Sequence, residues 1–261
     1  MIKLVMSDID GTLMNVGENR TVREERPSDK VYELIKELKS KGYMFCASSG
    51  RQYPSLKKLF APVSDGMFFS CENGSTVVYK DKVISQNLIK RETAERLIKT
   101  ILAENNAQPL ISGPMVSYLI NPSDDFYDCI KNYLGNVTVV VSSVDEIKEG
   151  IQKVAIYKPD GIADIAGRYK DEWGDKLNVA EAGSIWLDFT PGDKGDGLRM
   201  VCSAAGIDPC EVLAFGDNFN DIPMLSAAGL SFAMEAADSQ VKAAARGVCA
   251  DVVSKCRELL F

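Results

Sequence analysis

The hydrophobic and polar positions at the start of the chain predict strands alternating with a helix. Residues 3–7 and 43–48 are short apolar runs, partly β-branched, as is typical of buried strands, and 67–70 is a third. Between the first two, residues 30–41 have the spacing of an amphipathic helix, and four apolar side chains would share one face: Val31, Leu34, Ile35 and Leu38. Strand, helix and strand in this order predict a parallel, doubly wound sheet.

A different pattern follows in the middle of the chain. A hairpin is expected at 76–85 and a helix at 91–104. Short strands and helices then alternate, with strands at 108–111, 116–120, 137–141, 154–158, 177–181 and 184–189 and helices at 125–134 and 162–173. This block has the pattern of an α+β unit of its own.

After Pro191 and Gly192 the buried α/β pattern resumes. It predicts helices at 198–205, 222–227 and 253–260, and strands at 211–215 and 230–233. The predicted fold is therefore α/β, with a discontinuous core at 1–80 and 188–261 and an inserted α+β unit at 81–187. The polar segment 15–27 is expected to be a loop.

Composition and charge narrow the classes of function. Hydrophobic residues make up 46% and charged residues 26%, which is ordinary for a globular protein. The net charge of −7 argues against non-specific binding to nucleic acid or to anionic membrane, although it leaves room for an anionic substrate in one cleft. No apolar run is long enough for a signal peptide or a membrane span. The seven cysteines form no CxxC pair, so a reduced, cytoplasmic protein is expected.

The absence of histidine excludes several catalytic arrangements at once. Ser-His-Asp triads, Cys-His dyads, HExxH zinc sites and histidine general bases all require this residue. Acid–base chemistry must then come from carboxylates, Lys, Tyr or Cys.

Two aspartate-rich segments follow predicted strands. Asp8 and Asp10, with Gly11 after them, offer two carboxylates that suit a nucleophile, an acid–base group or a hard cation. An EF-hand loop is excluded, because Leu13 and Asn19 occupy its Gly and Glu positions, but an ordinary Asp-Gly turn stays open. In the second segment, Gly216 to Asp221, the alternatives are a Mg²⁺ site and a solvated loop that caps the next helix.

Two further candidates are weak when taken alone. Ser49, Gly50 and Arg51 follow a strand and suit a phosphate oxygen, although a turn with a helix cap explains this segment better when it is taken alone. Lys194 lies in a glycine-rich stretch that lacks the GK[ST] ending of a P-loop, so a surface lysine is the default. These segments all fall at the carboxyl ends of predicted strands or at a helix start, which is where open α/β sheets bind ligands.

Together these segments resemble the four motifs of the haloacid dehalogenase (HAD) superfamily. Asp8-x-Asp10-Gly11-Thr12 is similar to the first motif and Ser49 to the second. Lys194 is similar to the third and Gly216-Asp217-x-x-Asn220-Asp221 to the fourth. The insertion between the second and third motifs resembles Cof-type subfamily IIB phosphatases, as do Ala47–Arg51 and Glu72-Asn73-Gly74. The resemblance implies a Rossmann-like core sheet with a C2-type cap.

The resemblance also implies roles for these residues. Asp8 would attack phosphorus and form an aspartyl-phosphate, while Asp10 would protonate the leaving oxygen and then activate water. The implied Mg²⁺ ligands are Asp8, the Asp10 carbonyl, Asp217 and Asp221. Phosphate or substrate contacts would come from Ser49, Gly50, Arg51, Asn73, Lys194 and Asn220.

The expected function is a Mg²⁺-dependent phosphomonoesterase acting on a small phosphorylated metabolite, such as a sugar phosphate. The alternatives are a sugar phosphomutase or phosphotransferase with the same nucleophile, and a non-catalytic protein that binds a phosphorylated ligand. Three features depart from the family pattern: Ser49 stands where Thr is commoner, the loop after Thr12 is long, and the last helix lacks a preceding glycine-rich turn. Substrate specificity is expected in loops of the inserted unit, around 112–117 or 160–162.

Overall fold

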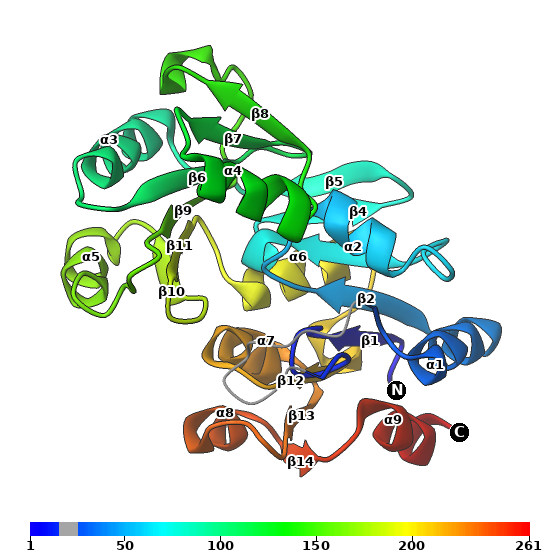
Figure 1. Cartoon of the computed structure of the whole chain (residues 1–261). Helices are drawn as coiled ribbons and strands as arrows, with labels where there is room; N and C mark the ends of the chain where they lie inside the picture. Colours follow the sequence, from blue (N-terminus) through cyan, green and yellow to red (C-terminus); the bar gives the residue numbers. More distant parts are fainter. Residues whose placement is uncertain (16–25) are drawn as a thin grey trace. The chain divides into compact units, whose positions relative to one another are not determined.

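The computed structural model describes residues 1–15 and 26–261, which divide into two compact units (Figure 1). The first comprises 1–51, 56–85 and 193–261, and the second comprises 52–55 and 86–192. The predicted boundaries, 80/81 and 187/188, each lie five residues before the main divisions at 85/86 and 192/193. Most of the predicted loop at 15–27 lies outside the described residues.

The first unit contains an eight-stranded sheet in the order β14-β13-β12-β1-β2-β3-β4-β5. The strands are β1 (Leu4–Ser7), β2 (Met44–Ser48), β3 (Phe68–Cys71), β4 (Thr76–Tyr79), β5 (Lys82–Gln86), β12 (Val212–Gly216), β13 (Leu230–Met234) and β14 (Gly247–Cys249). They run parallel from β14 to β3, and β4 is antiparallel to β3. Because β1 lies between β2 and β12, the order of the strands reverses at β1 and β12, and ligands of open α/β sheets bind beyond such a point.

Helices pack on both faces of this sheet. They are α1 (Asp29–Ser40), α6 (Lys194–Ala205), α7 (Ile222–Ala227), α8 (Ser239–Ala244) and α9 (Val252–Leu260). The residues of α2 (Tyr53–Leu59) are divided between the two units. Apolar residues of α6, α7 and α8 join one core cluster with Met6 and Ala214 of the sheet. Phe215 points to the other face and stacks on Phe232, over which Lys255 of α9 lies. Helix α1 contacts both β2 and α9, so α1 and α9 cover that other face.

The second unit is built on a six-stranded sheet in the order β10-β11-β9-β6-β7-β8. Its strands are β6 (Gln108–Ser112), β7 (Ser117–Ile120), β8 (Thr138–Val141), β9 (Lys153–Tyr157), β10 (Asn178–Glu181) and β11 (Trp186–Thr190). All neighbouring pairs are antiparallel except β7 and β8. Its helices are α3 (Arg91–Leu102), α4 (Asp124–Asp128), which continues into a π-helical turn, and α5 (Ala166–Trp173).

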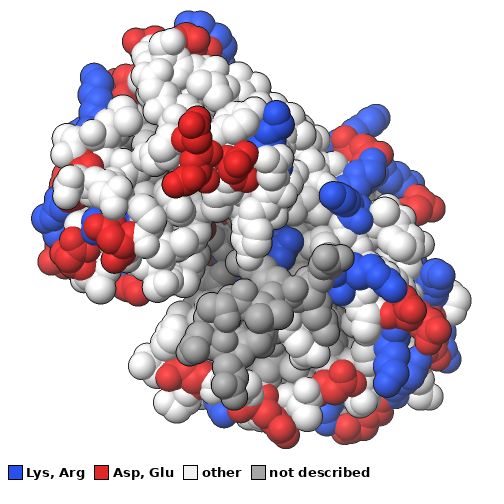
Figure 2. Space-filling view, in the orientation of Figure 1, with Lys and Arg blue, Asp and Glu red and all other residues white. Residues whose placement is uncertain are grey.

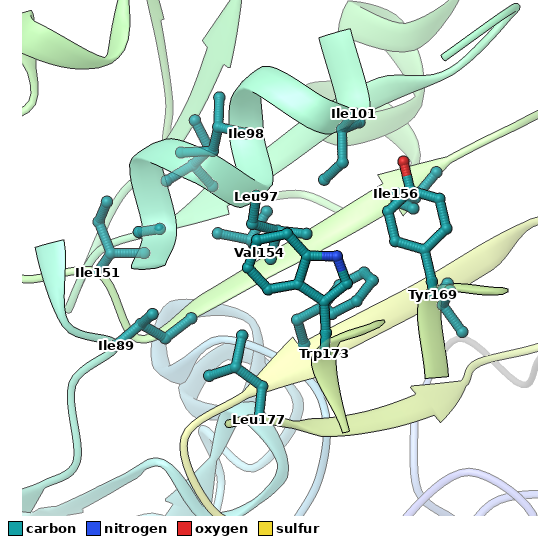
Figure 3. Close-up of a cluster of buried hydrophobic side chains, with 14 of the residues drawn as sticks. Ile89, Leu97, Ile98, Ile101, Ile151, Val154, Ile156, Tyr169, Trp173 and Leu177 are labelled. Carbon is teal, nitrogen blue, oxygen red and sulfur yellow. The ribbon is translucent and has the colours of Figure 1, made fainter. Parts of the chain in front are cut away.

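The main core of the second unit lies between one face of its sheet and helices α3 and α5 (Figure 3). Trp173 of α5 is fully buried there, among Leu97 and Ile101 of α3 and Val154 of β9. Along each strand alternate residues point to opposite faces, so the other face carries its own smaller cluster. In that cluster Phe126 of α4 stacks on Tyr157 with ring centroids 4.8 Å apart.

The fold confirms the predicted α/β class, with a mostly parallel core sheet interrupted by an α+β unit. Three short elements were not predicted: α2, α8 and β14. On the face drawn in Figure 2, acidic and basic side chains are interspersed, in contrast to the concentrated Lys and Arg that bind nucleic-acid backbones. Over residues 1–15 and 26–261, no helix combines the length and the apolar character needed to cross a membrane.

Candidate active site

Two aspartates follow neighbouring strands at the point where the strand order reverses. Strands β1 and β12 pair in parallel with Ser7 opposite Phe215, and Asp8 N donates to Phe215 O at 2.9 Å. Asp8 directly follows β1, and Asp217 directly follows β12. Together with Asp221, each can offer one carboxylate oxygen such that the three oxygens lie within 4.8 Å of one another. Parallel pairing thus brings together acidic residues that are more than 200 positions apart in the sequence.

The turn after β1 fits closely against Asp217. Gly11 has a φ of +102°, and a Cβ there would lie 2.2 Å from Asp217 Oδ2. The Thr12 hydroxyl donates to Asp217 Oδ1 at 3.2 Å. Gly11 therefore serves both the backbone reversal and the close approach of the two loops. Thr12 belongs to the first motif, and its contact with Asp217 depends on the tertiary fold.

Asp221 organises the loop after β12. Its Oδ2 accepts hydrogen bonds from the backbone N–H groups of Asp217 and Asn218, both at 2.9 Å. Its Oδ1 accepts from Lys194 Nζ at 2.5 Å, and the side chain is fully buried. One carboxylate therefore fixes both the backbone beside Asp217 and the position of the lysine.

Lys194 is the first residue of α6 and points into the acidic cluster. Its Nζ lies 2.5 Å from Asp8 Oδ1 and the same distance from Asp221 Oδ1, and its side chain is 1% exposed. A reciprocal capping box between Asp193 and Asp196 begins the helix at this residue. The default of a surface lysine is therefore wrong for Lys194.

The charges in this cluster are strongly coupled. Burial and the negative charge of Asp221 raise the pKa of the Asp8 carboxyl, and the nearby ammonium of Lys194 opposes this only in part. Burial by itself would lower the pKa of Lys194, but the carboxylates of Asp221 and Asp8 outweigh it and raise that pKa. Three carboxylates around one ammonium leave excess negative charge when all are ionised. Hard oxygen donors with excess negative charge suit Mg²⁺, so the donor set fits this metal.

Ser49 follows β2 and is held by backbone hydrogen bonds. Its N–H donates to Ser70 O at 2.9 Å, and its own carbonyl accepts from Asn73 N at 3.0 Å. Its hydroxyl accepts from Arg51 N at 3.2 Å. The backbone N–H groups of Ser49 and Arg51 are thus engaged within the protein, so the hydroxyl is the group of Ser49 best suited to meet a phosphate oxygen.

Asn73 lies in a short helical turn after β3 with φ 54° and ψ 37°, a left-handed conformation that Asn tolerates better than most residues. Its Oδ1 accepts from Asn220 Nδ2 at 3.1 Å. A Cβ on Gly50 would lie 3.1 Å from the same Oδ1. The adjacent Gly74 has a φ of +90°, and a Cβ there would lie 2.1 Å from Asp193 O. The turn is therefore packed tightly against the start of α6.

Arg51 forms a two-point ion pair with Asp10. Its Nε lies 2.9 Å from Asp10 Oδ2, and its Nη2 lies 2.6 Å from Asp10 Oδ1. Both side chains are about one-fifth exposed, at 21% and 20%. Arg51 was expected to contact phosphate, whereas these hydrogen bonds join it to the second aspartate of the first motif.

All the predicted site residues lie in the first unit. The hydrogen bonds and the close carboxylate oxygens join them into two groups. Asp8 lies with Lys194, Asp217 and Asp221. Asp10 pairs with Arg51, and Ser49 links Arg51 to Asn73, which bonds Asn220 beside Gly50. Three contacts were not predicted from the sequence: the hydrogen bond from Thr12 to Asp217, the close approach of Gly11 to Asp217, and the close approach of Gly74 to Asp193. The only available signal for the glycines was their place in aspartate- and asparagine-containing turns.

Comparison with known proteins places this geometry in a family. A family model described as haloacid dehalogenase-like hydrolase matches residues 5–254. The 5-amino-6-(5-phospho-D-ribitylamino)uracil phosphatase of Escherichia coli is 29% identical over 248 residues, which cover 94% of this chain and 89% of that protein. A crystal structure from Eubacterium rectale is 26% identical with a TM-score of 0.84 and covers 99% of both chains. The HAD subclass IIB sugar phosphatase BT4131 shares the fold, with a TM-score of 0.80, 20% identity and 98% of each chain covered.

Proposed function

The chain belongs to the haloacid dehalogenase-like hydrolases, and we propose that it is a Mg²⁺-dependent phosphomonoesterase that works through an aspartyl-phosphate at Asp8. One observation carries this proposal. Asp8, Asp217 and Asp221 converge around the buried ammonium of Lys194, which lies 2.5 Å from two of the three carboxylates. A metal-binding carboxylate cluster with a fixed cation is suited to phosphoryl transfer, in which positioning and electrostatic stabilisation dominate.

In the proposed first half-reaction, an Asp8 carboxylate oxygen attacks the phosphorus atom and the bond from phosphorus to the ester oxygen breaks. Asp10, two residues on, gives a proton to that departing oxygen. Lys194 stabilises the charge on the transferring phosphoryl oxygens, because its ammonium already lies beside Asp8. The Ser49 hydroxyl would hold another of these oxygens.

In the second half-reaction, Asp10 takes a proton from water, which attacks phosphorus and releases phosphate from Asp8. The ion pair with Arg51 holds the Asp10 carboxylate in place between these two proton transfers. Asp221 keeps the loop of Asp217 and the Lys194 ammonium fixed throughout.

The proposed Mg²⁺ ligands are the Asp8 carboxylate, the Asp10 main-chain carbonyl and Asp217, with Asp221 as a ligand or as support for the others. When bound, the metal would offset the charge of the phosphate and of the nucleophile. Without it, burial and the negative charge of Asp221 raise the pKa of the Asp8 carboxyl, which disfavours the ionised form that acts as nucleophile.

The substrate is proposed to be a small phosphorylated metabolite, such as a sugar or polyol phosphate. Two relatives support this class. The Escherichia coli relative is named for a phosphoribitylamino substrate, and BT4131 is named as a sugar phosphatase.

Phosphate release from a panel of small phosphate esters tests the proposal, with native and Asp8→Asn protein compared in Mg²⁺ and in EDTA. We expect release by native protein in Mg²⁺ and loss of at least about 1,000-fold in the variant, since the nucleophile is removed. Acid-quenched protein should carry phosphate on Asp8. Equal rates in the two proteins would disprove the assignment of the nucleophile, and transfer to an added alcohol without free phosphate would indicate a phosphotransferase.

A further inference from the structure

The turn of Glu72, Asn73 and Gly74 after β3 has a left-handed backbone at every residue. The φ angles are +50°, +54° and +90°, and all three residues are buried. Glycine adopts such angles without strain and Asn tolerates them, whereas Glu does so at a cost in free energy. Strained backbone persists only where the surrounding structure holds it, and it is concentrated at functional sites, so the contacts of this turn bear on its role.

On one side, the turn is tied to the segment of the second motif. Glu72 N donates to Arg51 O at 3.1 Å, and Asn73 N donates to Ser49 O at 3.0 Å. Ser49 N donates to Ser70 O of β3 at 2.9 Å. Backbone hydrogen bonds from both groups of Ser49 therefore fix the turn relative to the segment that carries the Ser49 hydroxyl.

On its other side, the turn packs against the start of α6. A Cβ on Gly74 would lie 2.1 Å from Asp193 O and 3.0 Å from Gly197 N. A Cβ on Gly197 would lie 2.3 Å from Ser70 Oγ and 2.8 Å from Gly74 Cα. The two backbones can come this close only because both positions are glycine.

This contact determines the position of the first residue of α6, which is Lys194. Asp193 is the N-cap of the helix and meets the turn directly. Lys194 follows it, and its Nζ lies 2.5 Å from Asp8 Oδ1 and from Asp221 Oδ1. A shift of the helix start by about 1 Å would carry the ammonium away from at least one of these partners, and misplacements of this size are enough to impair a catalytic site.

We propose that Gly74 and Gly197 are positioning residues whose contact holds Lys194 where its ammonium meets the oxygens of phosphate, an inference that rests on the proposed function of Lys194. The turn supports the Ser49 hydroxyl as well, because it bonds the Ser49 segment on one side and seats α6 on the other. Two groups proposed to bind phosphate oxygens thus share one support. All of these residues belong to the first unit.

Gly197→Ala tests the contact from the side of the helix. Alanine is favoured over glycine inside a helix, so the substitution should not weaken α6 itself, and any harm comes from the Cβ that meets Ser70 and Gly74. Gly167→Ala is the matched control, because Gly167 also lies in a helix, α5, and nothing lies within 4 Å of a Cβ built there.

Gly74→Ala tests the same contact from the side of the turn. Its control is Gly206→Ala, because Gly206 caps the other end of α6 and also has a positive φ, +67°. Nothing lies within 4 Å of a Cβ on Gly206, so this control strains the backbone without displacing Lys194.

The readout is the affinity of inorganic phosphate in Mg²⁺, measured by calorimetry, because phosphate meets the ammonium without turnover. Gly197→Ala and Gly74→Ala should each weaken phosphate binding about 10-fold, the value of one charge-assisted hydrogen bond, and both controls should stay within about 2-fold of native protein. The same substitutions are then made in Lys194→Met protein. There they should change the affinity less than about 2-fold, since the group through which they act is absent.

Weakening by the same factor with and without Lys194 would make the contact merely structural and overturn the proposal. Unchanged affinity in folded Gly197→Ala and Gly74→Ala protein would overturn it too, as would a native protein that binds no phosphate. Melting temperatures establish which variants fold. If Lys194→Met does not fold, crystal structures of native and Gly197→Ala protein with phosphate are compared instead. The ammonium should contact phosphate only in native protein, and the same contact in both would refute the positioning role.

Phosphate release from esters is assayed separately on native protein. A loss of phosphate affinity that depends on Lys194, without release from any ester, would refute the proposed phosphatase and retain the positioning role of Gly74 and Gly197.

Discussion

Arg51 holds Asp10 through two parallel hydrogen bonds, Nε to Oδ2 at 2.9 Å and Nη2 to Oδ1 at 2.6 Å. A guanidinium matches a carboxylate in this way because its donors lie in one plane, and a lysine ammonium cannot reproduce the geometry. The pair therefore fixes the orientation of the carboxylate that we propose as the acid–base group.

Arg51→Lys tests that role. The substitution keeps the positive charge but removes the two-point contact, and we expect kcat to fall about 10- to 100-fold through misplacement of Asp10. Arg199→Lys is the control, because Arg199 also contacts an aspartate but on an exposed helix surface. Steady-state kinetics on one phosphate ester measure both. A kcat of Arg51→Lys within about 2-fold of native would show that charge alone suffices.

Gly11→Ala tests the close approach of the first and fourth motifs. The new Cβ would lie 2.2 Å from Asp217 Oδ2, so Asp217 must shift. We expect at least about 100-fold lower activity, since small misplacements of catalytic groups have such effects, and loss of the Mg²⁺-induced rise in melting temperature.

Gly42→Ala is a matched control for backbone strain. Gly42 also has a positive φ, +85°, but nothing lies within 4 Å of a Cβ built there. Gly42→Ala should lose about 1 kcal/mol of stability from backbone strain alone and keep its activity, whereas Gly11→Ala should lose more stability than this and also lose activity. Equal activity in the two would mean that the loop moves without harm to Asp217.

Asp8→Asn should stabilise the metal-free protein at neutral pH. Burial and the charge of Asp221 raise the pKa of Asp8 above its ordinary value of 3.8. At pH values between the pKa of Asp8 in the unfolded chain and its raised pKa in the folded protein, the folded state binds more protons than the unfolded state. The contribution of Asp8 to the free energy of unfolding therefore falls as pH rises. The variant lacks this titrating carboxyl, so its free energy of unfolding should exceed that of native protein by an amount that grows from about pH 4 upward.

Urea unfolding in EDTA across this pH range measures the difference. Asp171→Asn, at an exposed aspartate of α5, should follow native protein at each pH. A stability gap between Asp8→Asn and native protein that does not depend on pH would contradict the prediction.

Asp221→Ala should be strongly destabilising. It removes a fully buried partner of Lys194 and the acceptor of two backbone N–H groups, and breaking a buried ion pair typically costs about 3–5 kcal/mol. Glu181→Ala breaks the exposed pair with Lys170 and should cost at most about 1 kcal/mol. Urea unfolding compares the two. A similar small cost for both would show that Asp221 is not needed for the fold.

The cysteines should differ sharply in reactivity. Burial raises the pKa of Cys202 to about 11 and of Cys256 to about 12, so almost no thiolate forms at pH 8. Cys210 is exposed and Cys129 is partly exposed, whereas the other five are buried. An aromatic disulfide reagent at pH 8 should therefore modify Cys210 first, then Cys129, and the remaining thiols only after unfolding. Rapid modification of all seven in native protein would contradict this burial.

The local pattern of the sequence determined the elements that carry the site. Residues 3–7 and 211–215 are short, mostly apolar runs, and each is followed within two residues by an aspartate. Runs of this length bounded by turn residues favour buried strands. The positions of Asp8 and Asp217 at strand ends followed from this alone. Short elements such as α8 and β14 were missed because six and three residues are too few to show a period.

Only the tertiary structure decided which side chains meet. Lys194 is 186 positions from Asp8, and nothing in its own segment distinguished it from a surface lysine. The pairing of Arg51 with Asp10 arises in the same way. Periodicity along one strand shows which face a residue occupies, whereas the register between strands and the packing of loops decide its neighbours, and these depend on the fold as a whole.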